Sequence, residues 1–370
     1  MRQTASRFGR SFVTCGSAWF AFAALGGPVS AQEVGAAAGI YQKACAACHG
    51  IDGRGAALDQ VGFDVPLPDF ADCSFASREP AADWYAIAHE GGPVRAFDRR
   101  MPSFSGVLSV SDLELAVAHT KAFCADRAWP QGELNLPRAL VTEKAYPEDE
   151  AVLSTTMASG TFVNEFLYER RIGARSQVEV NVPVGAQDAG SGWHRGLGDV
   201  KVALKHVLSH SADTGHILSV AGEVRLPTGK ENEGLGKGVT IFEPFVAYGQ
   251  LLTADSFLHV QAGAEFPTNG DRASNELFWR TAFGRSFVEG EFGRTWSPII
   301  ELLGARELGE HESMLWDVVP QMQVTLSRRQ HVMVNAGVRL PINDREWRGT
   351  EVLTYLLWDW FDGGFFDGWR

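Results

Sequence analysis

Long apolar runs, cysteine and basic charge are all scarce in this chain of 370 residues. After the first thirty residues, no stretch approaches the ~20 consecutive apolar residues of a membrane-spanning helix, so any part that crosses a membrane has to be a β-barrel. Only one C-x-x-C pair occurs among the five cysteines, which argues against a four-cysteine zinc site. The formal net charge of −12 argues against nucleic acid as a partner.

Residues 1–31 have the layout of a secretory signal peptide. Positive charge comes first, an uncharged and mostly apolar run from Ala18 to Ala24 follows, and Val29-Ser30-Ala31 supplies small residues for cleavage. The positive charges are Arg2, Arg7 and Arg10. The alternative, a retained membrane anchor, is disfavoured because the apolar run is too short to span a bilayer. We therefore expect an exported protein.

The most specific motif is Cys45-Ala46-Ala47-Cys48-His49. Two thiols one helical turn apart can reach the two vinyl groups of a haem, and the histidine that follows can reach the iron. A redox-active C-x-x-C or half of a zinc site is disfavoured by the immediate histidine and by the lack of a second pair. We expect one covalent haem c, anchored by Cys45 and Cys48, with His49 as an iron ligand.

Met101 is the candidate for the sixth iron ligand. It lies in Arg100-Met101-Pro102-Ser103-Phe104, well after the motif, where Pro102 would stiffen the loop that presents the sulfur. The rival ligands are His89 and His119, each of which also has an ordinary explanation as a surface or helix residue. The iron is therefore expected to have His49 and Met101 as axial ligands.

Two helices are predicted around these ligands. Residues 33–48 should form a helix that enters the motif, and Ser111 with Glu114 should make a capping box at the start of a closing helix that crosses the first. The apolar face of the closing helix is predicted to consist of Leu113, Ala116, Val117 and Thr120.

With these motifs, residues 32–127 resemble small single-haem cytochromes c of the His/Met kind. The resemblance implies an all-helical fold with one exposed haem edge, and electron transfer as its chemistry. Pro66, Pro68 and Trp84 are candidates for the pocket wall, with ordinary packing as the alternative.

Cys73 and Cys124 are the two cysteines of this segment that the motif does not use. In an oxidising compartment, two leftover cysteines in one domain most simply form a disulfide. Free buried thiols are the alternative. The disulfide would tie the loop after the haem motif to the end of the closing helix.

Residues 128–150 differ in composition from what precedes them. Pro130, Pro137 and Pro147 occur among mixed charges, which predicts an extended linker.

Residues 151–370 alternate between apolar and polar with a period of two, which predicts about ten to twelve antiparallel strands in meander order. The runs end at turn residues such as Pro227-Thr228-Gly229 and Asn269-Gly270-Asp271. The clearest runs are Val178, Val180 and Val182; Val200, Val202 and Leu204; Met322, Val324 and Leu326; and Val332, Val334, Ala336 and Val338.

A transmembrane barrel is favoured over a soluble β-sandwich by the strand length, the exported context and the aromatic residues. Near the predicted strand ends, where interfacial girdles would lie, the sequence has Trp193, Phe242, Phe245, Tyr248, Phe257, Trp279, Phe283, Trp296, Trp316, Tyr355, Trp358 and Trp360. The fold class is therefore an all-α cytochrome c domain followed by an all-β antiparallel barrel.

The segment Gly196-Leu197-Gly198-Asp199-Val200-Lys201-Val202, followed by Val224-Arg225-Leu226-Pro227-Thr228-Gly229, resembles the outer-membrane barrel family associated with the MetA pathway of phenol degradation. The resemblance implies a pore-like barrel in the outer membrane. The chain departs from many such barrels because it ends at Asp367-Gly368-Trp369-Arg370, without a terminal aromatic residue. Phe361 is the candidate for closing the last strand, with a short tail after it.

The sequence favours an outer-membrane-anchored cytochrome that transfers single electrons. The alternative is an outer-membrane channel for small solutes with an accessory haem domain. A redox enzyme is disfavoured because six-coordinate iron has no open site, and only a labile Met101 would provide one. The expected partners are periplasmic or outer-membrane redox proteins and outer-membrane lipid.

The haem domain is expected outside the barrel, on its periplasmic side. A compact domain of this size is roughly 30 Å across, whereas small barrels leave an interior that side chains nearly fill. The lumen could still accept residues 129–150. The periplasmic placement follows because haem is attached after export, and a folded domain could not thread a narrow barrel.

Overall fold

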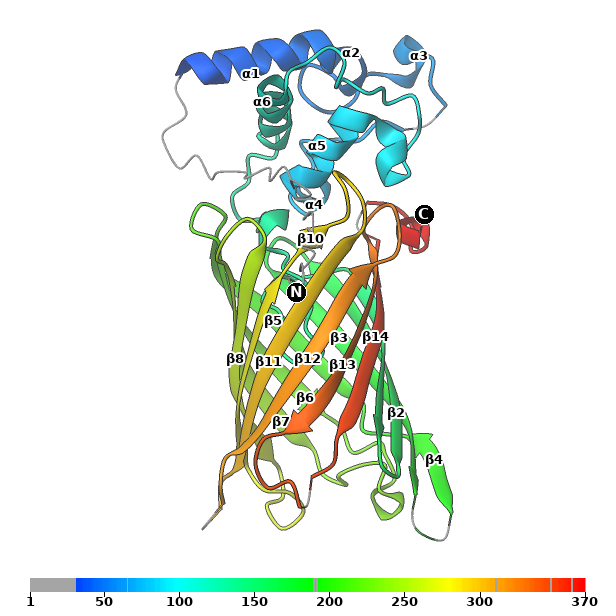
Figure 1. Ribbon diagram of the computed structural model, residues 1–370, viewed down its shortest axis with the longest axis vertical. Helices are drawn as coiled ribbons and strands as arrows, with labels where there is room; N and C mark the ends of the chain where they lie inside the picture. The colour runs from blue at the N-terminus through cyan, green and yellow to red at the C-terminus, as the bar shows by residue number, and fades with distance from the viewer. Residues whose placement is uncertain are drawn as a thin grey trace, which may run out of the picture.

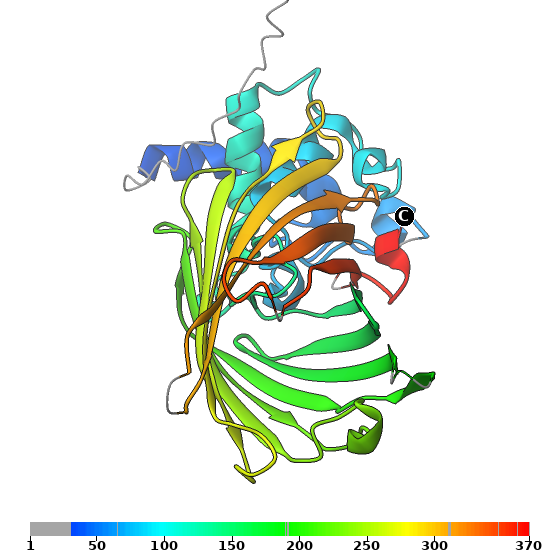
Figure 2. The ribbon, with the colours of Figure 1, turned by 60° about the horizontal axis from the view of Figure 1, so that its bottom comes forward.

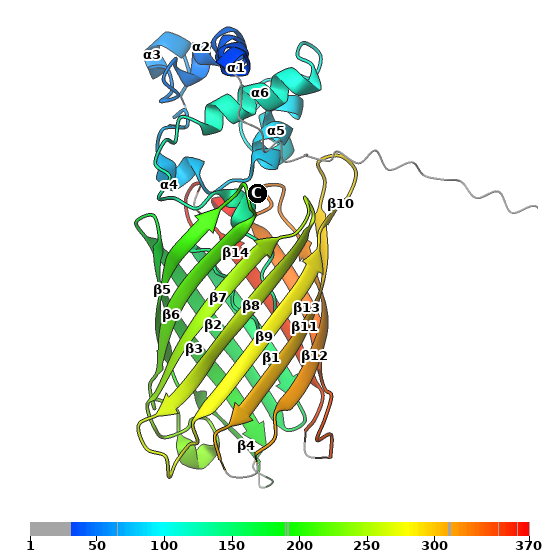
Figure 3. The ribbon, with the colours of Figure 1, turned by 90° about the vertical axis from the view of Figure 1, so that its left-hand side faces the viewer.

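The computed structural model describes residues 31–369, except for residues 65, 189, 191, 310–311, 347 and 361. A helical domain sits on one end of a β-barrel, outside its lumen (Figures 1 and 3). Residues 1–30 of the predicted signal peptide, and Phe361, lie outside the described residues. No described helix has the length and apolarity needed to cross a membrane.

Six α-helices and one short 3-10 helix make up the helical domain. They are α1 (Ala31–Ala44), α2 (Ala46–His49), α3 (Leu58–Val61), α4 (Cys73–Ala76), α5 (Ala81–Glu90), η1 (Gly92–Arg95) and α6 (Val110–Lys121). The helix predicted over residues 33–48 is thus interrupted at Cys45, between α1 and α2. As predicted, α6 crosses α1: the Tyr41 ring lies 5.1 Å from the rings of both His119 and Phe123.

The start of α6 differs from the prediction. Its N-cap is Ser109, whose Oγ accepts the N–H of Asp112 at 3.2 Å, while the Asp112 carboxylate accepts the N–H of Ser109 at 3.4 Å. The predicted capping box of Ser111 and Glu114 was wrong. Ser111 with Glu114 and Ser109 with Asp112 have the same spacing, but only Ser109 has the extended backbone of an N-cap. The predicted buried face is confirmed: Leu113, Ala116, Val117 and Thr120 are all buried.

Twelve strands form a closed antiparallel barrel, because β1 pairs with β2 on one side and with β14 on the other. The twelve are β1 (Glu150–Ala158), β2 (Thr161–Ile172), β3 (Ser176–Asp188), β5 (Lys201–Ser211), β6 (His216–Arg225), β7 (Ile241–Leu251), β8 (Ser256–Pro267), β9 (Glu276–Arg285), β11 (Thr295–Glu307), β12 (Leu315–Thr325), β13 (Val332–Pro341) and β14 (Glu351–Asp359). Two short strands, β4 (Trp193–Leu197) and β10 (Phe287–Val288), pair antiparallel with β3 and β11, respectively. The predicted fold class is confirmed.

The apolar side chains of the strands face outward. In β3, Gln177 and Glu179 are buried in the lumen, whereas Val180 and Val184 are 38% and 51% exposed on the outer wall. The same holds in β12, where Gln323 is buried and Met322 is exposed. A soluble sandwich would bury its apolar face, so this arrangement identifies a barrel of the outer-membrane type.

Only some of the predicted girdle aromatics lie on the outer wall. Trp193, Phe242, Trp279, Phe283 and Trp296 are exposed, as expected for a girdle. Phe245, Phe257 and Tyr355 are instead buried inside the barrel, which corrects their assignment to a girdle. The period of two cannot reveal this, because it leaves open which face of a strand is the outer one.

The two ends of the barrel differ in their connections (Figures 1 and 2). The end that carries the helical domain has the tight turns 173–175, 212–215 and 252–255, and the opposite end has the longer loops 226–240 and 342–350. The predicted family motif lies at the opposite end. There the buried Asp199 carboxylate accepts the N–H groups of Gly229 at 3.0 Å and Lys237 at 2.7 Å, so it holds the 226–240 loop in place.

Candidate functional site: a haem motif on a plugged barrel

Of the two motif cysteines, Cys45 lies at the junction of α1 and α2, and Cys48 lies within α2. Both are half-buried and are not joined to each other. The turn between them is tight, because the N–H groups of Cys48 and His49 both donate to the carbonyl of Cys45, at 3.2 and 2.9 Å. Tyr41 Oη donates to the carbonyl of Gly50 at 2.8 Å and so ties the end of the motif back to α1. The two thiols and His49 are thereby presented together.

His49 is held in an aromatic layer. Its ring lies 4.9 Å from that of Phe70, which in turn lies 5.0 Å from that of Trp84 on α5. Burial lowers the pKa of His49 to about 4, which keeps the imidazole neutral and leaves a ring nitrogen free to bind a metal. Its Nδ1 atom is buried without a hydrogen-bond partner among the described residues.

A mostly apolar cleft of about 430 Å³ adjoins the motif. One wall is the end of α1, with Ile40, Lys43 and Ala44. The other is the segment that follows Met101, with Phe104, Val107 and Leu108, and Asp112 of α6 completes the lining. Val107 is 77% exposed, far more than an apolar residue of a packed core. Thiols, a neutral histidine and an apolar cleft are together what a haem c requires, so the residues fit that group.

Met101 lies in a loop that is fixed to the end of α5. Its carbonyl accepts the N–H of Gly92 at 3.0 Å. Further along, the N–H groups of Phe104 and Ser105 donate to the carbonyls of Ala88 and His89, at 3.1 and 3.3 Å. The loop is therefore ordered next to the cleft, and the role of Met101 as sixth ligand stays a prediction.

The two rival histidines have other surroundings. His89 Nδ1 lies 2.8 Å from a carboxylate oxygen of Glu90, and its ring lies 5.3 Å from Phe292 of the barrel. His119 packs between α1 and α6, against Tyr41 and Phe123.

Met101→Ala is expected to remove the weak near-infrared sulfur-to-iron band of oxidised His/Met haem and to open the iron to added ligands such as cyanide. The measurement is an absorption spectrum of the oxidised protein. His119→Ala is the matched control and should keep the band. A band that persists in Met101→Ala would point to another sulfur, and its absence from the parent would point to His89 or His119.

The structure joins Cys73 and Cys124 in a disulfide, 51 positions apart in sequence. Cys73 begins α4, and Cys124 follows α6 and packs against the core that contains Trp84 and Leu113. The bond therefore closes the domain across its core.

Cys73→Ser is expected to lower the thermal midpoint of the haem domain while leaving its spectrum unchanged. In the chain-entropy model a loop of this length contributes roughly 4 kcal/mol before strain is counted. Thermal unfolding followed at the haem absorption band measures the shift. Two free thiols in the native, haem-loaded parent would contradict the pairing.

Buried ion pairs hold the helical domain on the barrel. Arg78, after α4, pairs with Asp149 just ahead of β1, with the two side chains 8% and 4% exposed. Asp149 also accepts the N–H of Arg171 from β2 at 3.0 Å. Glu79 Oε2 lies 3.5 Å from Nε2 of His331, in the turn between β12 and β13. Charges buried in this way need their partners, so the contact positions the domain firmly.

A second contact joins α5 and η1 to the turn between β10 and β11. Arg95 donates to the carbonyl of Phe292 at 2.8 Å, and the Phe292 side chain packs against the hydrophobic core of the helical domain. In the neighbouring turn, the Arg329 guanidinium lies 4.2 Å from the centre of the Phe97 ring. The domain thus rests on two turns of the rim.

Residues 132–149, which we call the plug, run into the barrel lumen, so the predicted extended linker is a folded element. The regular structure within this fully described segment is the single turn η2 (Gly132–Leu134). Side chains of the lumen wall form hydrogen bonds with several other backbone groups of the plug. The Glu301 carboxylate, fully buried, accepts the N–H groups of Leu140, Val141 and Thr142, at 3.1, 3.1 and 2.6 Å.

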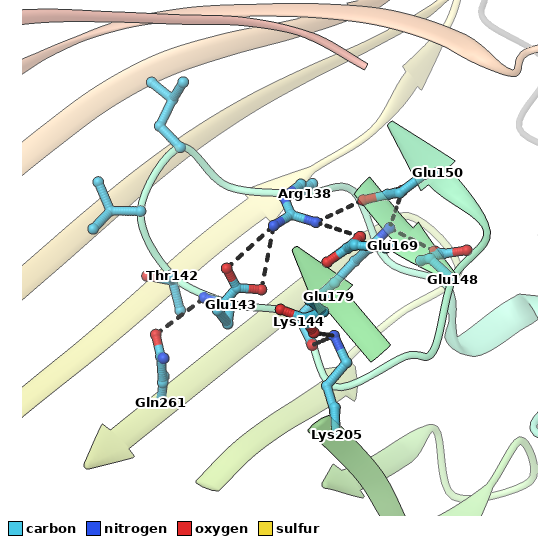
Figure 4. Close-up of polar contacts among 12 residues, drawn as sticks. Arg138, Thr142, Glu143, Lys144, Glu148, Glu150, Glu169, Glu179, Lys205 and Gln261 are labelled. Carbon is cyan, nitrogen blue, oxygen red and sulfur yellow. Dashed lines mark hydrogen bonds and ion pairs between the residues drawn. The ribbon is translucent and has the colours of Figure 1, made fainter. Parts of the chain in front are cut away.

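Arg138 is the centre of a buried charge network in the plug (Figure 4). Its guanidinium donates to Glu143 at 3.1 Å, to Glu150 at 2.6 Å and to Glu169 at 3.0 Å. Its carbonyl accepts the hydroxyl of Tyr355 at 2.6 Å. Arg138 thereby links the plug to β1 and β2 through its side chain and to β14 through its carbonyl group.

A second cation extends this network. Lys144 Nζ lies 2.6 Å from Glu148 and 3.2 Å from Glu150. Lys205, from β5, pairs with Glu179 at 3.3 Å and donates to the carbonyl of Lys144 at 3.3 Å (Figure 4). Every cation here has a carboxylate partner, as burial of charge demands.

Apolar contacts between plug and lumen wall are equally extensive. Leu134 and Tyr146 share a buried cluster with Phe245 and Phe278; Leu136 and Ala139 pack against Phe257; and Leu140 and Val141 pack against Leu303. An open water-filled pore would expose these wall residues at a cost of ~25 cal/mol per Å² of apolar surface. The plug is therefore the core of the barrel.

The sequence carried a signal for the plug that the linker prediction overlooked. Leu134, Leu136 and Leu140 are more apolar than a solvated linker needs, and Arg138 and Lys144 lie among acidic residues. The partners that explain this pattern come from strands far along the chain, such as Glu301 and Gln321, so only the fold reveals it.

Residues 32–119 match the family described as Cytochrome C oxidase, cbb3-type, subunit III. This segment is therefore a cytochrome c-type domain. No curated protein matches the chain.

Among solved structures, the chain is similar to an outer-membrane channel from Pseudomonas putida F1 (12% identity, TM-score 0.43, covering 60% of this chain and 99% of that one). It is also similar to the NanC porin, with 8% identity and a TM-score of 0.41 over 57% of this chain and 98% of that one. The KdgM porin has 9% identity and a TM-score of 0.37 over 57% of this chain and 99% of that one. These scores are low, and the barrel assignment rests on the strand pairing described above.

Proposed function

We propose that this protein transfers single electrons as a one-haem c-type cytochrome anchored in the outer membrane. The observation that carries the proposal is the placement of the Cys45–His49 motif in a cytochrome c-type domain that is clamped on a membrane-type barrel whose lumen is filled. A filled barrel serves as an anchor for the domain it carries.

Each residue of the site has a role in this proposal. Cys45 and Cys48 would hold the haem through two thioether bonds, and His49 and Met101 would be the axial ligands. When bound, the haem supplies an iron that takes up and releases one electron. Phe70 packs against the His49 ring, and the burial that keeps His49 neutral preserves its lone pair. Thioether ligation by Met101 would raise the reduction potential, since sulfur favours ferrous iron.

The cytochrome domain is proposed to face the periplasm. Outer-membrane barrels have short turns on the periplasmic side and longer loops outside. Here the turns 173–175, 212–215 and 252–255 lie at the end that carries the domain, and the loops 226–240 and 342–350 lie at the opposite end, together with the short turn 159–160. The barrel also begins and ends there, at Glu150 and Asp359. The electron donor and acceptor would then be periplasmic or outer-membrane redox proteins.

Labelling of two exposed lysines tests this topology. Lys43 lies on α1 of the cytochrome domain, and Lys230 lies at the opposite end of the barrel with 66% of its side chain exposed. A membrane-impermeant amine reagent on intact cells should modify Lys230 and leave Lys43 unmodified, while permeabilised cells should show both by mass spectrometry. Modification of Lys43 alone in intact cells would show that the topology is reversed.

The alternative is a channel for small solutes, and the plug lies in the lumen through which those solutes would pass. The cavity at the plug tip, lined by Val141, Arg280, Asp317 and Arg339 among others, measures about 200 Å³. Conduction would require the plug to leave its buried partners.

A further inference from the structure

Residues 362–369, which we call the tail, follow the last strand and are fixed to the barrel rim. The tail includes the short helix η4 (Asp367–Trp369), which lies beside the rim at the end that carries the cytochrome domain (Figure 1). Asp362 pairs with Arg329 at 2.9 Å. Gly368 lies so close to the barrel that an added Cβ would be 2.5 Å from the carbonyl oxygen of Asp359. The tail therefore has a defined position.

The tail covers two tryptophans at the end of β14. Trp358 lies opposite Ala151 of β1, one position away from the lumen-facing Asp359. Its ring is 5.5 Å from that of Trp369 and 5.7 Å from that of Phe365. Trp360 lies 4.7 Å from Phe365. Both tryptophans are buried although they belong to the outer wall, so the tail stands where lipid would otherwise contact the barrel.

The surface that the tail itself presents is aromatic. Phe366 is 71% exposed and Trp369 is 43% exposed. Next to them on β2, Phe166 and Tyr168 are exposed and contact the covered tryptophans, with Tyr168 stacked on Trp360 at 5.7 Å. These rings continue the apolar outer wall of the barrel to the rim.

We propose that the tail is a membrane anchor that binds the phospholipid interface at the rim beneath the cytochrome domain. Aromatic rings are most stable at the headgroup level of a bilayer, where their faces contact acyl chains and their polar edges contact water. The exposed rings of the tail are continuous with the lipid-facing wall of the barrel, which favours lipid over a protein partner as the molecule that contacts them. The inference rests on the membrane location in the proposed function and assigns to the tail a contact that the strands alone would not make.

Fluorescence quenching of the full-length, haem-loaded protein in phosphatidylcholine vesicles tests the proposal. The emission of Trp369 is obtained by subtracting the spectrum of Trp369→Phe from that of the parent. Subtracting the spectrum of Trp296→Phe gives the emission of Trp296, which serves as a reference on the outer wall of β11. Lipid brominated near the headgroup should quench both emissions to a similar fraction, and aqueous iodide should quench Trp369 no more than Trp296. Unchanged heat-modifiable gel mobility of both variants controls for folding.

The two tryptophans separate the possible failures. Quenching of Trp296 but not of Trp369 by brominated lipid would overturn the tail proposal. Quenching of Trp369 by iodide would then place the tail in water, and protection from iodide would indicate a protein partner. If brominated lipid quenches neither residue, the membrane location fails, and the tail proposal fails with it.

Discussion

Protein in which Cys45 and Cys48 are both replaced by alanine is expected to carry no covalent haem. In the proposed function thioether bonds would form only at these two thiols, because the other two cysteines of the described residues, Cys73 and Cys124, are joined to each other. Each single change should leave one thioether and shift the absorption spectrum of the reduced haem. Haem staining on a denaturing gel measures the loss.

Cys73→Ser is the matched control for this prediction. It also removes a cysteine from the same domain, but outside the motif, so its haem stain should equal that of the parent. Equal stain in the double variant would show that the attachment site lies elsewhere in the chain.

The second large effect is expected at Arg138, where replacement by methionine should destabilise the barrel by about 3–5 kcal/mol. The change leaves Glu143, Glu150 and Glu169 without the cation that they share, and the last two are almost completely buried. Urea unfolding in detergent, followed by tryptophan fluorescence, measures the loss. Arg138→Lys keeps the charge but not the forked geometry, and should fall in between.

A control for this prediction is Arg54→Met, because Arg54 is 61% exposed and pairs only with exposed carboxylates among the described residues. Its effect on stability should be close to zero. A similar loss of stability in Arg54→Met and Arg138→Met would show that the network contributes nothing specific.

Conductance in planar bilayers decides whether the plug blocks the lumen. The parent should pass no steady current, and Arg138→Met should show openings as the plug loosens. A steady open-pore current through the parent, retained when Cys45 and Cys48 are replaced, would favour the channel function over the electron-transfer function.

Local sequence patterns are enough to predict the features that depend on only a few residues. The haem motif and the buried face of α6 each lie within a dozen residues, and their spacing alone restricts what they can form. The capping box shows the limit of such patterns, because Ser109 and Ser111 satisfy the same spacing. Backbone conformation, which the sequence does not state, selects Ser109.

Features that depend on residues far apart could not be predicted in the same way. Phe245, Phe257 and Tyr355 were assigned to girdles because aromatic residues suit both lipid and a buried core. Their true environment is set by the plug, about one hundred to two hundred positions earlier in the chain. The plug has the composition of a linker because the strand partners of its Arg138 charge come from β1 and β2.

The haem motif and the strand alternation can be read from the residues alone. Covalent attachment needs two thiols and a histidine at a fixed spacing, and a pleated strand turns every second side chain the same way. Tertiary structure alone decided what fills the barrel and how the cytochrome domain is held. Glu301 can cap the plug, and Asp149 can bind Arg78, only when closure of twelve strands brings them there. Buried charges are stable only next to partners, and those partners are assembled by the fold.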